Sequence, residues 1–520
     1  MRGLLRGAAA GVLAAGLGIA VAELFAAAAR PGAGPLVAVG GAVIDATPTA
    51  VKEFAVRELG THDKPVLLAS VGLVVALFAA LIGVLGQRRR ALVAAGAAVL
   101  GVAGAAAALS RPAGTLPDTG PSLLAAAIAG VTLWWLLAQA ARLSVASPGS
   151  APSVSSPGSD LSASSRRGDR AEPAAGTERR AFLRGAALVA GAAVLAEGGA
   201  LIIRRTAGRV RTDLRLPAPA SAAKPSDPRL VTPAGDFYRV DTALTVPRID
   251  PDAWSLRVHG MVGRELRLSL DDLLRRPLIE RDITLNCVSN EVGGPYIGTA
   301  RWLGVPLGPL LREAGLLEGA DQIVARSVEG MTIGTPVATA LDGRDTMLAV
   351  AMNGAPLPPE HGFPVRMLTP GLYGYAGACK WVTELELTTF AAFDAYWVKR
   401  GWARAGTVRT ASRIDKPRPF ARLAPGPVTV AGVAWAQRRG IAKVEVSVDG
   451  GPWRPAELLP VPSVDTWVQW RYSWRATTGP HSLAVRATDG DGTVQTEERA
   501  TPFPSGATGW HTTTVTVTPA

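Results

Sequence analysis

The chain contains two cysteines, and the first of them, Cys287, precedes a loop suited to holding a ligand. Ile283, Leu285 and Cys287 share one face of a predicted strand, and Gly293 and Gly294 follow within a few residues. Glycine lets a backbone approach a bulky ligand closely, and a thiolate is a soft ligand for a metal. Cys287 is therefore a candidate ligand. The alternative is a small core residue, a common role for a cysteine between apolar neighbours.

A second glycine-rich stretch, residues 361–381, collects cationic side chains. It contains His361, Arg366 and Lys380 among four glycines. Arginine can grip a phosphate with two parallel hydrogen bonds, lysine adds a point charge, and glycine exposes backbone N–H groups. The pattern predicts a loop that binds a phosphorylated ligand. A surface loop with scattered charges is the alternative.

Short strands and a short helix are expected to position these two loops. Residues 254–259 alternate between apolar and polar side chains, as in a half-buried strand. A helix is expected at about 270–276, because Ser269 precedes two aspartates that suit a helix N-terminus. We therefore predict an α+β domain over residues 204–417.

The C-terminal residues 418–520 have the pattern of an all-β domain. Apolar side chains alternate with polar ones over 444–448, 468–474 and 483–487, and Asp449-Gly450-Gly451 is a hairpin signal. About 100 residues of such strands indicate an immunoglobulin-like sandwich. We expect this domain to pack or dimerise, since it contains no obvious catalytic cluster.

The first 143 residues contain four apolar stretches that are each close to the length needed to cross a bilayer as a helix. Basic residues flank the first stretch and separate the second from the third, which places these ends on the cytoplasmic side. The region 1–143 is therefore predicted to be a four-helix membrane region, with stretches at about 4–28, 66–86, 91–109 and 121–142.

Residues 144–178 are rich in Ser, Pro, Gly and Ala and are predicted to form a flexible linker. A fifth apolar helix is expected at 179–203, and it begins with Arg179-Arg180. The arginine pair resembles a twin-arginine export signal, although an ordinary positive-inside flank would look similar. In either case five crossings place residues 204–520 outside the cytoplasmic membrane.

Composition excludes several classes of function. Residues 1–203 carry 17 basic and 11 acidic side chains and residues 204–520 carry 37 and 31, so neither half is basic enough to predict nucleic-acid binding. Two cysteines cannot form an iron–sulfur set or a disulfide framework. None of the five histidines lies in the predicted membrane helices, so we expect no haem there.

The residues of about 225–520 resemble the sulfite oxidase family of molybdopterin enzymes, in its bacterial membrane-anchored form. The ordered set of motifs is more specific than any one of them. The resemblance rests on the segments 284–290, 352–354, 361–366, 370–371 and 380–381, and on the closing Gly509-Trp510-His511-Thr512.

This resemblance implies a molybdenum–molybdopterin cofactor, with Cys287 as the protein ligand to the metal. It also implies catalytic roles for Cys287, Arg239 and Tyr396, with Arg239 near an anionic substrate. The implied cofactor-binding residues are Tyr238, Arg239, Cys287, Asn290, His361, Arg366 and Lys380. The C-terminal domain resembles the family's dimerisation domain, which implies a homodimer.

The sequence also departs from the family pattern. Sulfite oxidases have arginines after the Cys-x-x-Asn motif, whereas Glu291 and Val292 stand there in this chain. A less positive site argues against a sulfite dianion as substrate. The haem domain of animal sulfite oxidases is missing, so electrons are expected to pass to or from a separate partner.

These observations predict a membrane-anchored oxidoreductase that performs two-electron oxygen-atom transfer on a small substrate, with its catalytic domain on the extracytoplasmic side. The reaction direction, the electron partner and the purpose of the first four helices stay open. One alternative is a cofactor-free binding or scaffold protein that keeps the fold. Another is a structural disulfide between Cys287 and Cys379 in the oxidising exterior.

Overall fold

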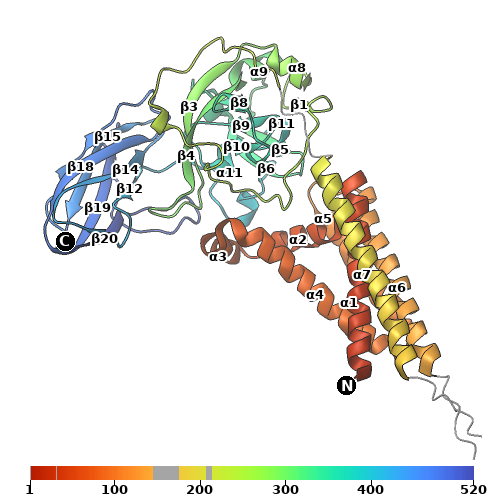
Figure 1. Cartoon of the computed structure of the whole chain (residues 1–520). Helices are drawn as coiled ribbons and strands as arrows, with labels where there is room; N and C mark the ends of the chain where they lie inside the picture. The colour runs from red at the N-terminus through yellow and green to blue at the C-terminus, as the bar shows by residue number, and fades with distance from the viewer. Residues whose placement is uncertain (1, 31, 145–174, 207–213, 520) are drawn as a thin grey trace, which may run out of the picture. The chain divides into compact units, whose positions relative to one another are not determined.

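The computed structural model describes residues 2–30, 32–144, 175–206 and 214–519 (Figure 1). It divides into two compact units, which we describe separately. The helical unit comprises residues 1–48 and 55–208, and the globular unit comprises residues 49–54 and 209–520. Most of the predicted linker, residues 145–174, lies outside the described residues.

The five predicted apolar helices are confirmed, and each is long and apolar enough to cross a membrane. They are α1 (Arg2–Ala29), α4 (Asp63–Gly86), α5 (Ala91–Ser110), α6 (Gly120–Ser144) and α7 (Ala175–Thr206). The shorter helices α2 (Pro35–Ala46), α3 (Thr49–Leu59), η1 (Gly60–His62) and η2 (Leu116–Thr119) were not predicted.

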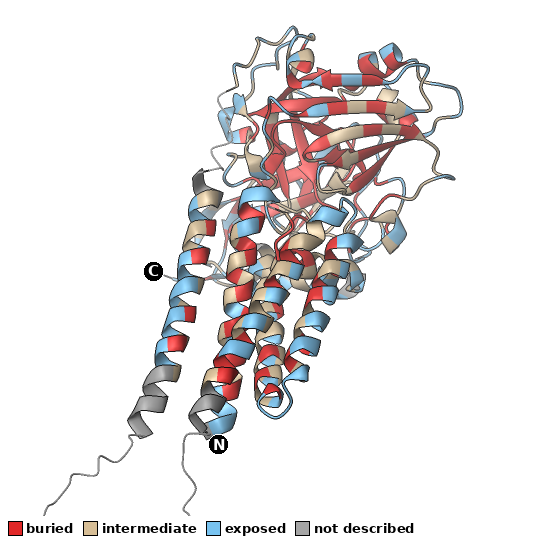
Figure 2. Cartoon of the chain, turned by 90° about the vertical axis from the view of Figure 1, so that its right-hand side faces the viewer, coloured by how far each residue is buried: buried red, intermediate tan, exposed pale blue. Residues whose placement is uncertain are grey.

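The long helices expose aliphatic side chains and meet through small residues. On α4, Leu73, Val74 and Leu77 are each more than 60% exposed, and Figure 2 shows buried residues only as short bands along the helices. A Cβ on Gly11 would lie 1.9 Å from the Ala79 carbonyl oxygen, so glycine permits the close approach of α1 and α4. Small residues at helix contacts and apolar outer faces are typical of membrane bundles.

Two sheets form the first part of the globular unit. One has the order β2 (Leu266–Ser269), β1 (Ser255–Gly260), β11 (Val382–Thr388), β5 (Gln322–Ser327) and β6 (Thr332–Pro336), with β1 and β11 parallel. The other has the order β10 (Ala378–Cys379), β9 (Arg366–Leu368), β7 (Met347–Met352), β4 (Ile297–Pro306) and β3 (Ile279–Asn286), and β8 (Ala355–Pro356) pairs with β7.

Short helices connect these strands and complete the predicted mixture of helix and strand. They are η3 (Pro228–Leu230), α8 (Leu270–Leu274), α9 (Leu307–Ala314), α10 (Val337–Leu341), η4 (Pro359–His361), α11 (Gly374–Gly377) and η5 (Val398–Arg400). The predicted start of α8 is confirmed: Ser269 Oγ accepts from the Asp272 N–H, and Asp272 Oδ2 accepts from the Ser269 N–H. This reciprocal pair satisfies N–H groups that a helix start leaves unpaired.

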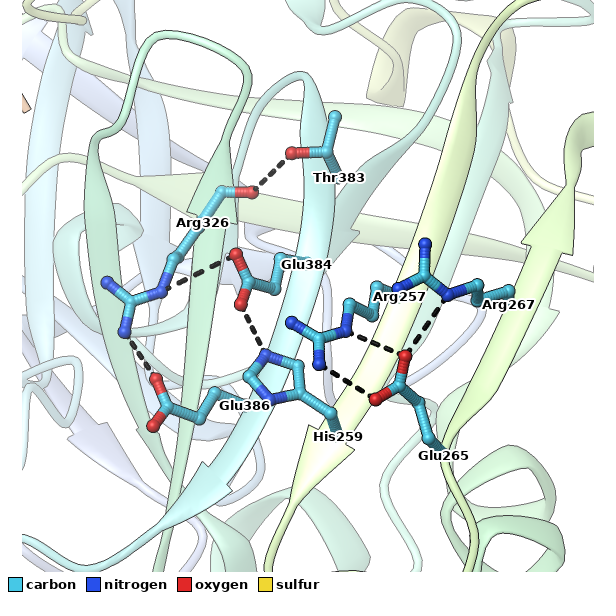
Figure 3. A network of polar contacts seen from close by, with 8 residues as sticks. All are labelled: Arg257, His259, Glu265, Arg267, Arg326, Thr383, Glu384 and Glu386. Carbon is cyan, nitrogen blue, oxygen red and sulfur yellow. Dashed lines mark hydrogen bonds and ion pairs between the residues drawn. The ribbon is translucent and has the colours of Figure 1, made fainter. Parts of the chain in front are cut away.

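The alternation along β1 and β11 separates a buried face from a charged one. Leu256, Val258 and Leu385 are fully buried in one core. The opposite face carries an ion-pair network in which Arg257 binds Glu265 at 2.8 Å, His259 contacts Glu384, and Arg326 contacts Glu386 (Figure 3). Opposite charges on neighbouring strands stabilise the pairing, and the charged face explains the polar positions of the sequence pattern.

The C-terminal part of the globular unit consists of two further sheets around one core. The first is β12 (Ala411–Lys416), β14 (Gly426–Trp435), β18 (Val468–Ala476) and β17 (Glu457–Leu458). The second is β13 (Arg422–Leu423), β20 (His511–Val517), β19 (Gly479–Asp489), β15 (Ile441–Val448) and β16 (Arg454–Pro455). The predicted strands are confirmed, while the immunoglobulin-like topology stays a prediction.

Contacts from this C-terminal part fix strand β3, which leads to Cys287. The Trp467 N–H donates to Thr284 Oγ1 at 2.7 Å, and the Gln437 side-chain amide donates to the Thr284 carbonyl at 3.2 Å. The Thr284 N–H donates to the Asp465 carbonyl at 2.9 Å. Because buried polar groups must be paired, these bonds hold β3 in one position relative to the C-terminal sheets.

We expect Leu348→Ala to destabilise the globular unit. Leu348, on β7, is 0% exposed within the larger core, and such truncations cost about 2–5 kcal/mol. Denaturant unfolding of the full chain, followed by tryptophan fluorescence, measures the change. Leu317→Ala is the matched control, because Leu317 is 49% exposed. Equal losses from the two variants would contradict the assigned core.

Candidate active site

Cys287 lies directly beyond the last residue of β3, in a loop that closes on itself. The Cys287 N–H donates to the Tyr296 carbonyl at 2.9 Å, and its carbonyl accepts from the Asn290 N–H at 3.1 Å. Asn290 Oδ1 in turn accepts from the Tyr296 N–H at 2.8 Å. Asn290 thus fixes the backbone around the cysteine. These three bonds hold the thiol at one place, as a metal ligand requires.

The Cys287 thiol is buried, and burial raises its pKa, while hydrogen bonds from Ser289 and the charge of Lys380 act in the opposite direction. A thiol in this environment stays protonated near neutral pH and is a poor nucleophile. A bound metal cation would remove the proton, because coordination deprotonates a thiol. The environment therefore suits a metal ligand better than a nucleophile.

Arg366 begins β9 and is 5% exposed. Its guanidinium carbon lies 5.2 Å from the centre of the Trp302 ring, and Nη1 donates to the His361 carbonyl at 3.3 Å. Its Nε is buried without a hydrogen-bond partner within the described residues. Burying a charged donor without a partner is costly, so this atom points to a missing acceptor on a ligand.

His361, at the end of η4, is held in one tautomer. Its Nε2 lies 2.8 Å from the Ala234 carbonyl oxygen. A carbonyl can only accept, so Nε2 carries the proton. Burial lowers the pKa of His361 to about 4, and the ring is neutral at pH 7. Nδ1, which is buried and lacks a partner among the described atoms, is therefore an acceptor.

Lys380 and Arg239 meet at Asp241, a residue that sequence analysis missed. Lys380 Nζ lies 2.8 Å and Arg239 Nε 2.9 Å from Asp241 Oδ2. Burial lowers the pKa of Lys380 to about 8, and the Asp241 carboxylate offsets part of that effect. The side chains of Lys380 and Asp241 are 10% and 7% exposed, so this ion pair is largely shielded from water. Asp241 lies two residues after Arg239 in the sequence, and this spacing was the signal that could have identified it.

Tyr238 lies beside Cys287 and Arg366. Its ring stacks on Phe237 at 5.2 Å between centroids and lies 6.5 Å from the Tyr296 ring. Burial, followed by the neighbouring Cys287, raises the pKa of its phenol, and the charge of Arg366 opposes the rise. Tyr238 therefore stays protonated and can donate a hydrogen bond.

Of the predicted residues, Asn290 lies in the Cys287 loop itself, and the titratable ones are brought together with one exception. They are close enough for their charges to shift one another's pKa values, and we call this set the Cys287 cluster: Tyr238, Arg239, Asp241, Cys287, His361, Arg366 and Lys380. Tyr396 is the exception. Its N–H donates to Thr332 Oγ1 at 2.9 Å and the Arg400 guanidinium lies 3.5 Å from its ring centre. These contacts do not place its hydroxyl at the cluster, and its catalytic role stays a prediction.

The Cys287 cluster fits a metal–pterin cofactor. A pterin N–H group can donate a hydrogen bond to His361 Nδ1, and a pterin oxygen can accept one from Arg366 Nε. The charges of Lys380 and Arg239 suit a phosphate. No group of three or more His, Cys, Asp or Glu side chains within the described ranges could hold a metal ion. A metal on Cys287 would consequently take most of its ligands from the cofactor.

The disulfide considered as an alternative is not formed, because both cysteines are free and buried. Cys379 lies on β10 within the larger core, and its Sγ donates to the Lys380 carbonyl at 3.6 Å. Its surroundings are those of a core residue.

Protonation of His361 should lower the stability of the folded protein at acid pH. Its folded-state pKa of about 4 lies below its usual 6.5, so the unfolded chain binds this proton more readily. Stability that is fully present above pH 6.5 is therefore lost as the pH falls toward about 4. We expect His361→Gln to reduce the fall in melting temperature over this range.

His481→Gln is the control with the opposite sign. A hydrogen bond to Asp449 raises the pKa of His481, so its contribution is present at low pH and is lost as the pH rises. His481→Gln removes this contribution, so the melting temperature should fall further between neutral and acid pH than it does in the wild-type protein. Melting temperatures that change in the same direction for both variants would refute the assignment of His361 as a neutral, buried ring.

Comparison with known proteins places these residues in a family. Residues 243–397 match the oxidoreductase molybdopterin binding domain model. The chain is 30% identical over 320 residues to sulfite oxidase of Gallus gallus, covering 52% of this chain and 69% of that protein. It is 34% identical over 273 residues to mitochondrial sulfite oxidase of Homo sapiens, covering 44% of this chain and 49% of that protein.

A third relative is named for a different activity. Nitrate reductase [NADH] 1 of Oryza sativa subsp. japonica is 29% identical over 334 residues, which cover 52% of this chain and 36% of that protein. The chain thus spans about half of the length of the first mammalian relatives that it matches. Taken with the cluster around Cys287, the match over two thirds of the avian enzyme shows that this chain belongs to the sulfite oxidase family of molybdopterin oxidoreductases.

Proposed function

We propose that this chain is a molybdenum-dependent enzyme that transfers one oxygen atom to or from a small substrate, with two electrons exchanged. One observation carries the proposal: a rigidly held, buried thiol lies in one cluster with three cations and with two buried polar atoms, His361 Nδ1 and Arg366 Nε, that lack partners within the described residues. A core cysteine or a surface loop would not require such surroundings.

The residues of the Cys287 cluster have separable tasks. When bound, the molybdenum–pterin cofactor supplies the two-electron redox change and the exchange of oxygen. Cys287 would hold the metal, and Lys380 would balance the phosphate charge. Arg366 Nε would donate to a pterin oxygen, and neutral His361 would accept a hydrogen bond from the pterin. Tyr238, which stays protonated, can donate a hydrogen bond to an oxygen beside Cys287. Such fixed donors stabilise developing negative charge.

We propose a small sulfur-oxo or nitrogen-oxo compound of low charge as the substrate. Arg239, expected to meet an anionic substrate, is already paired with Asp241 at 2.9 Å. Together with Glu291 and Val292 in the loop after Cys287, this pair makes the site less favourable for a dianion. Assays with sulfite, nitrate and dimethyl sulfoxide test the substrate class. A preference for sulfite by a large factor would contradict it.

We further propose that the five long helices anchor the chain in the cytoplasmic membrane, with the catalytic domain outside. The support is their length, their exposed aliphatic faces and the basic flanks. Arg179-Arg180 would act as a twin-arginine export signal. A separate protein would exchange electrons with the cofactor, and the immunoglobulin-like C-terminal domain would form a homodimer.

We expect Cys287→Ser to abolish activity while the fold and the bound pterin remain, because the hydroxyl is a far weaker metal ligand than the thiolate. Activity, molybdenum content and pterin fluorescence after oxidation are the measurements. Cys379→Ser is the matched control, since its hydroxyl can still donate to the Lys380 carbonyl. Full activity of Cys287→Ser would disprove the metal assignment, and wild-type protein without molybdenum or pterin would favour the scaffold alternative.

Arg366→Lys should weaken cofactor retention. Loss of a charge-assisted hydrogen bond costs about 1.5–3 kcal/mol, roughly a tenfold to hundredfold weaker binding. The ratio of pterin to protein after gel filtration measures retention without an activity assay. Arg257→Lys is the control, because Arg257 pairs with Glu265 on the charged outer face. Unchanged retention in Arg366→Lys would show that this guanidinium does not bind the cofactor.

A further inference from the structure

The residues Asn353-Gly354 form the tight turn between β7 and β8. Met352 pairs with Ala355 across this turn, and the two central residues have φ values of +55° and +80°. Asparagine or aspartate followed by glycine is typical of such two-residue hairpins, because both central positions require a positive φ. The turn alone therefore explains the residue types, and it leaves the role of the Asn353 side chain to be explained.

The side chain of Asn353 joins two segments that are distant in the sequence. Its Oδ1 accepts from the Arg301 N–H of β4 at 3.0 Å, and its Nδ2 donates to the Thr232 carbonyl at 3.0 Å. A backbone N–H can only donate and a carbonyl can only accept, so these partners fix the orientation of the amide. Among the residues that suit this turn, only asparagine offers both groups, because aspartate accepts only and glycine has no side chain.

Thr232 begins the stretch that carries a partner of His361. The Thr232 N–H donates to the Thr299 carbonyl at 2.7 Å, and its Oγ1 accepts from the Thr299 N–H at 3.3 Å. Two residues later, the Ala234 carbonyl lies 2.8 Å from His361 Nε2. The residue between them is Pro233, whose ring restricts φ and stiffens the link. The position of the Thr232 carbonyl therefore bears on the direction of the Ala234 carbonyl.

The stretch 232–239 continues along β4 to the Cys287 cluster. Phe237 is 5% exposed, and its ring lies 5.6 Å from the His361 ring in a T-shaped arrangement. A Cβ on Gly298 of β4 would lie 2.9 Å from the Phe237 ring, so glycine permits this packing. The stretch thus contacts His361 at two points, the Ala234 carbonyl and the Phe237 ring, and both depend on how it lies against β4.

We propose that Asn353 is a positioning residue for His361. By holding the Thr232 carbonyl, Asn353 places the Ala234 carbonyl to accept from His361 Nε2, and so keeps Nδ1 as the nitrogen without a proton. This Nδ1 is buried and lacks a partner among the described atoms, so the effect of Asn353 reaches an atom that a ligand can bind. The positioning itself is independent of the proposed function, whereas the identity of the ligand as a pterin rests on it.

Asn353→Asp tests the positioning most sharply. It keeps the turn and the bond from the Arg301 N–H, but it replaces the donor at the Thr232 carbonyl with a second acceptor, so Thr232 must move. The measurement is NMR of the full chain with 15N-labelled histidines at neutral pH, where protonated and unprotonated ring nitrogens have well-separated shifts. Wild-type His361 should show one protonated and one unprotonated nitrogen, and the variant should show averaged signals. Wild-type signals in the variant would overturn the proposal.

Gln469→Glu is the matched control. It makes the same change from amide to carboxylate, and it removes a bond that Gln469 Nε2 donates to the Arg229 carbonyl at 3.0 Å, before the stretch begins. The His361 signals, identified by their loss in His361→Gln, should stay as in the wild type. Equal changes in the two variants would show that Asn353 has no specific role. If Asn353→Asp does not fold, Asn353→Gly keeps the turn and removes both bonds, and unchanged His361 signals in that variant would also count against the proposal.

Pterin retention connects the positioning with the proposed function. In protein that carries pterin, Asn353→Asp should lower the ratio of pterin to protein after gel filtration roughly fivefold, which is about the worth of one hydrogen bond, and Gln469→Glu should leave the ratio unchanged. Wild-type protein without pterin would count against the proposed function alone, because the histidine signals still decide whether Asn353 positions His361.

Discussion

The burial of cationic side chains around Asp241 is the constraint on which the site depends. Arg366 and Lys380 lie in surroundings that disfavour their charges, and the pKa of each is lowered by burial. Asp241 contacts Lys380 and Arg239 directly. Buried charge that is not compensated is costly. The cluster therefore suits an anionic ligand such as a phosphate.

Neutral His361 adds a hydrogen-bond acceptor of fixed position to this group of charged side chains. The hydrogen bond from Nε2 to the Ala234 carbonyl joins residues 127 positions apart and leaves Nδ1 as an acceptor. A phosphate oxygen cannot donate to this nitrogen, whereas a pterin N–H can. His361 thus offers an acceptor and Arg366 a donor, although the sequence places them in one loop.

Local pattern was enough to predict the elements, together with Cys287 and the set of His361, Arg366 and Lys380, while the other site residues were named from the family resemblance. The alternation around β1, the capping residues of α8, the apolar helices and the cations of residues 361–381 are properties of neighbouring residues, and the structure confirms these elements. Asp241 was missed because its pairing with Lys380 spans 139 positions, which local pattern does not encode. The tautomer of His361 likewise depends on a distant residue, because Ala234 lies 127 positions away in the sequence.

Tyr396 was placed in the site by motif order alone, and its catalytic role stays a prediction. Motif order predicts that a residue belongs to a site, but the position of its hydroxyl depends on the path of the chain after β11. The described contacts of Tyr396 include Thr332, Trp397 and Arg400. Cys287 differs because its position is fixed on several sides: β3 ends directly before it, the Tyr296 carbonyl binds its N–H, and the C-terminal sheets hold Thr284. The role proposed for Cys287 needs several such contacts, since a shift of the backbone would move the sulfur relative to the rest of the cluster.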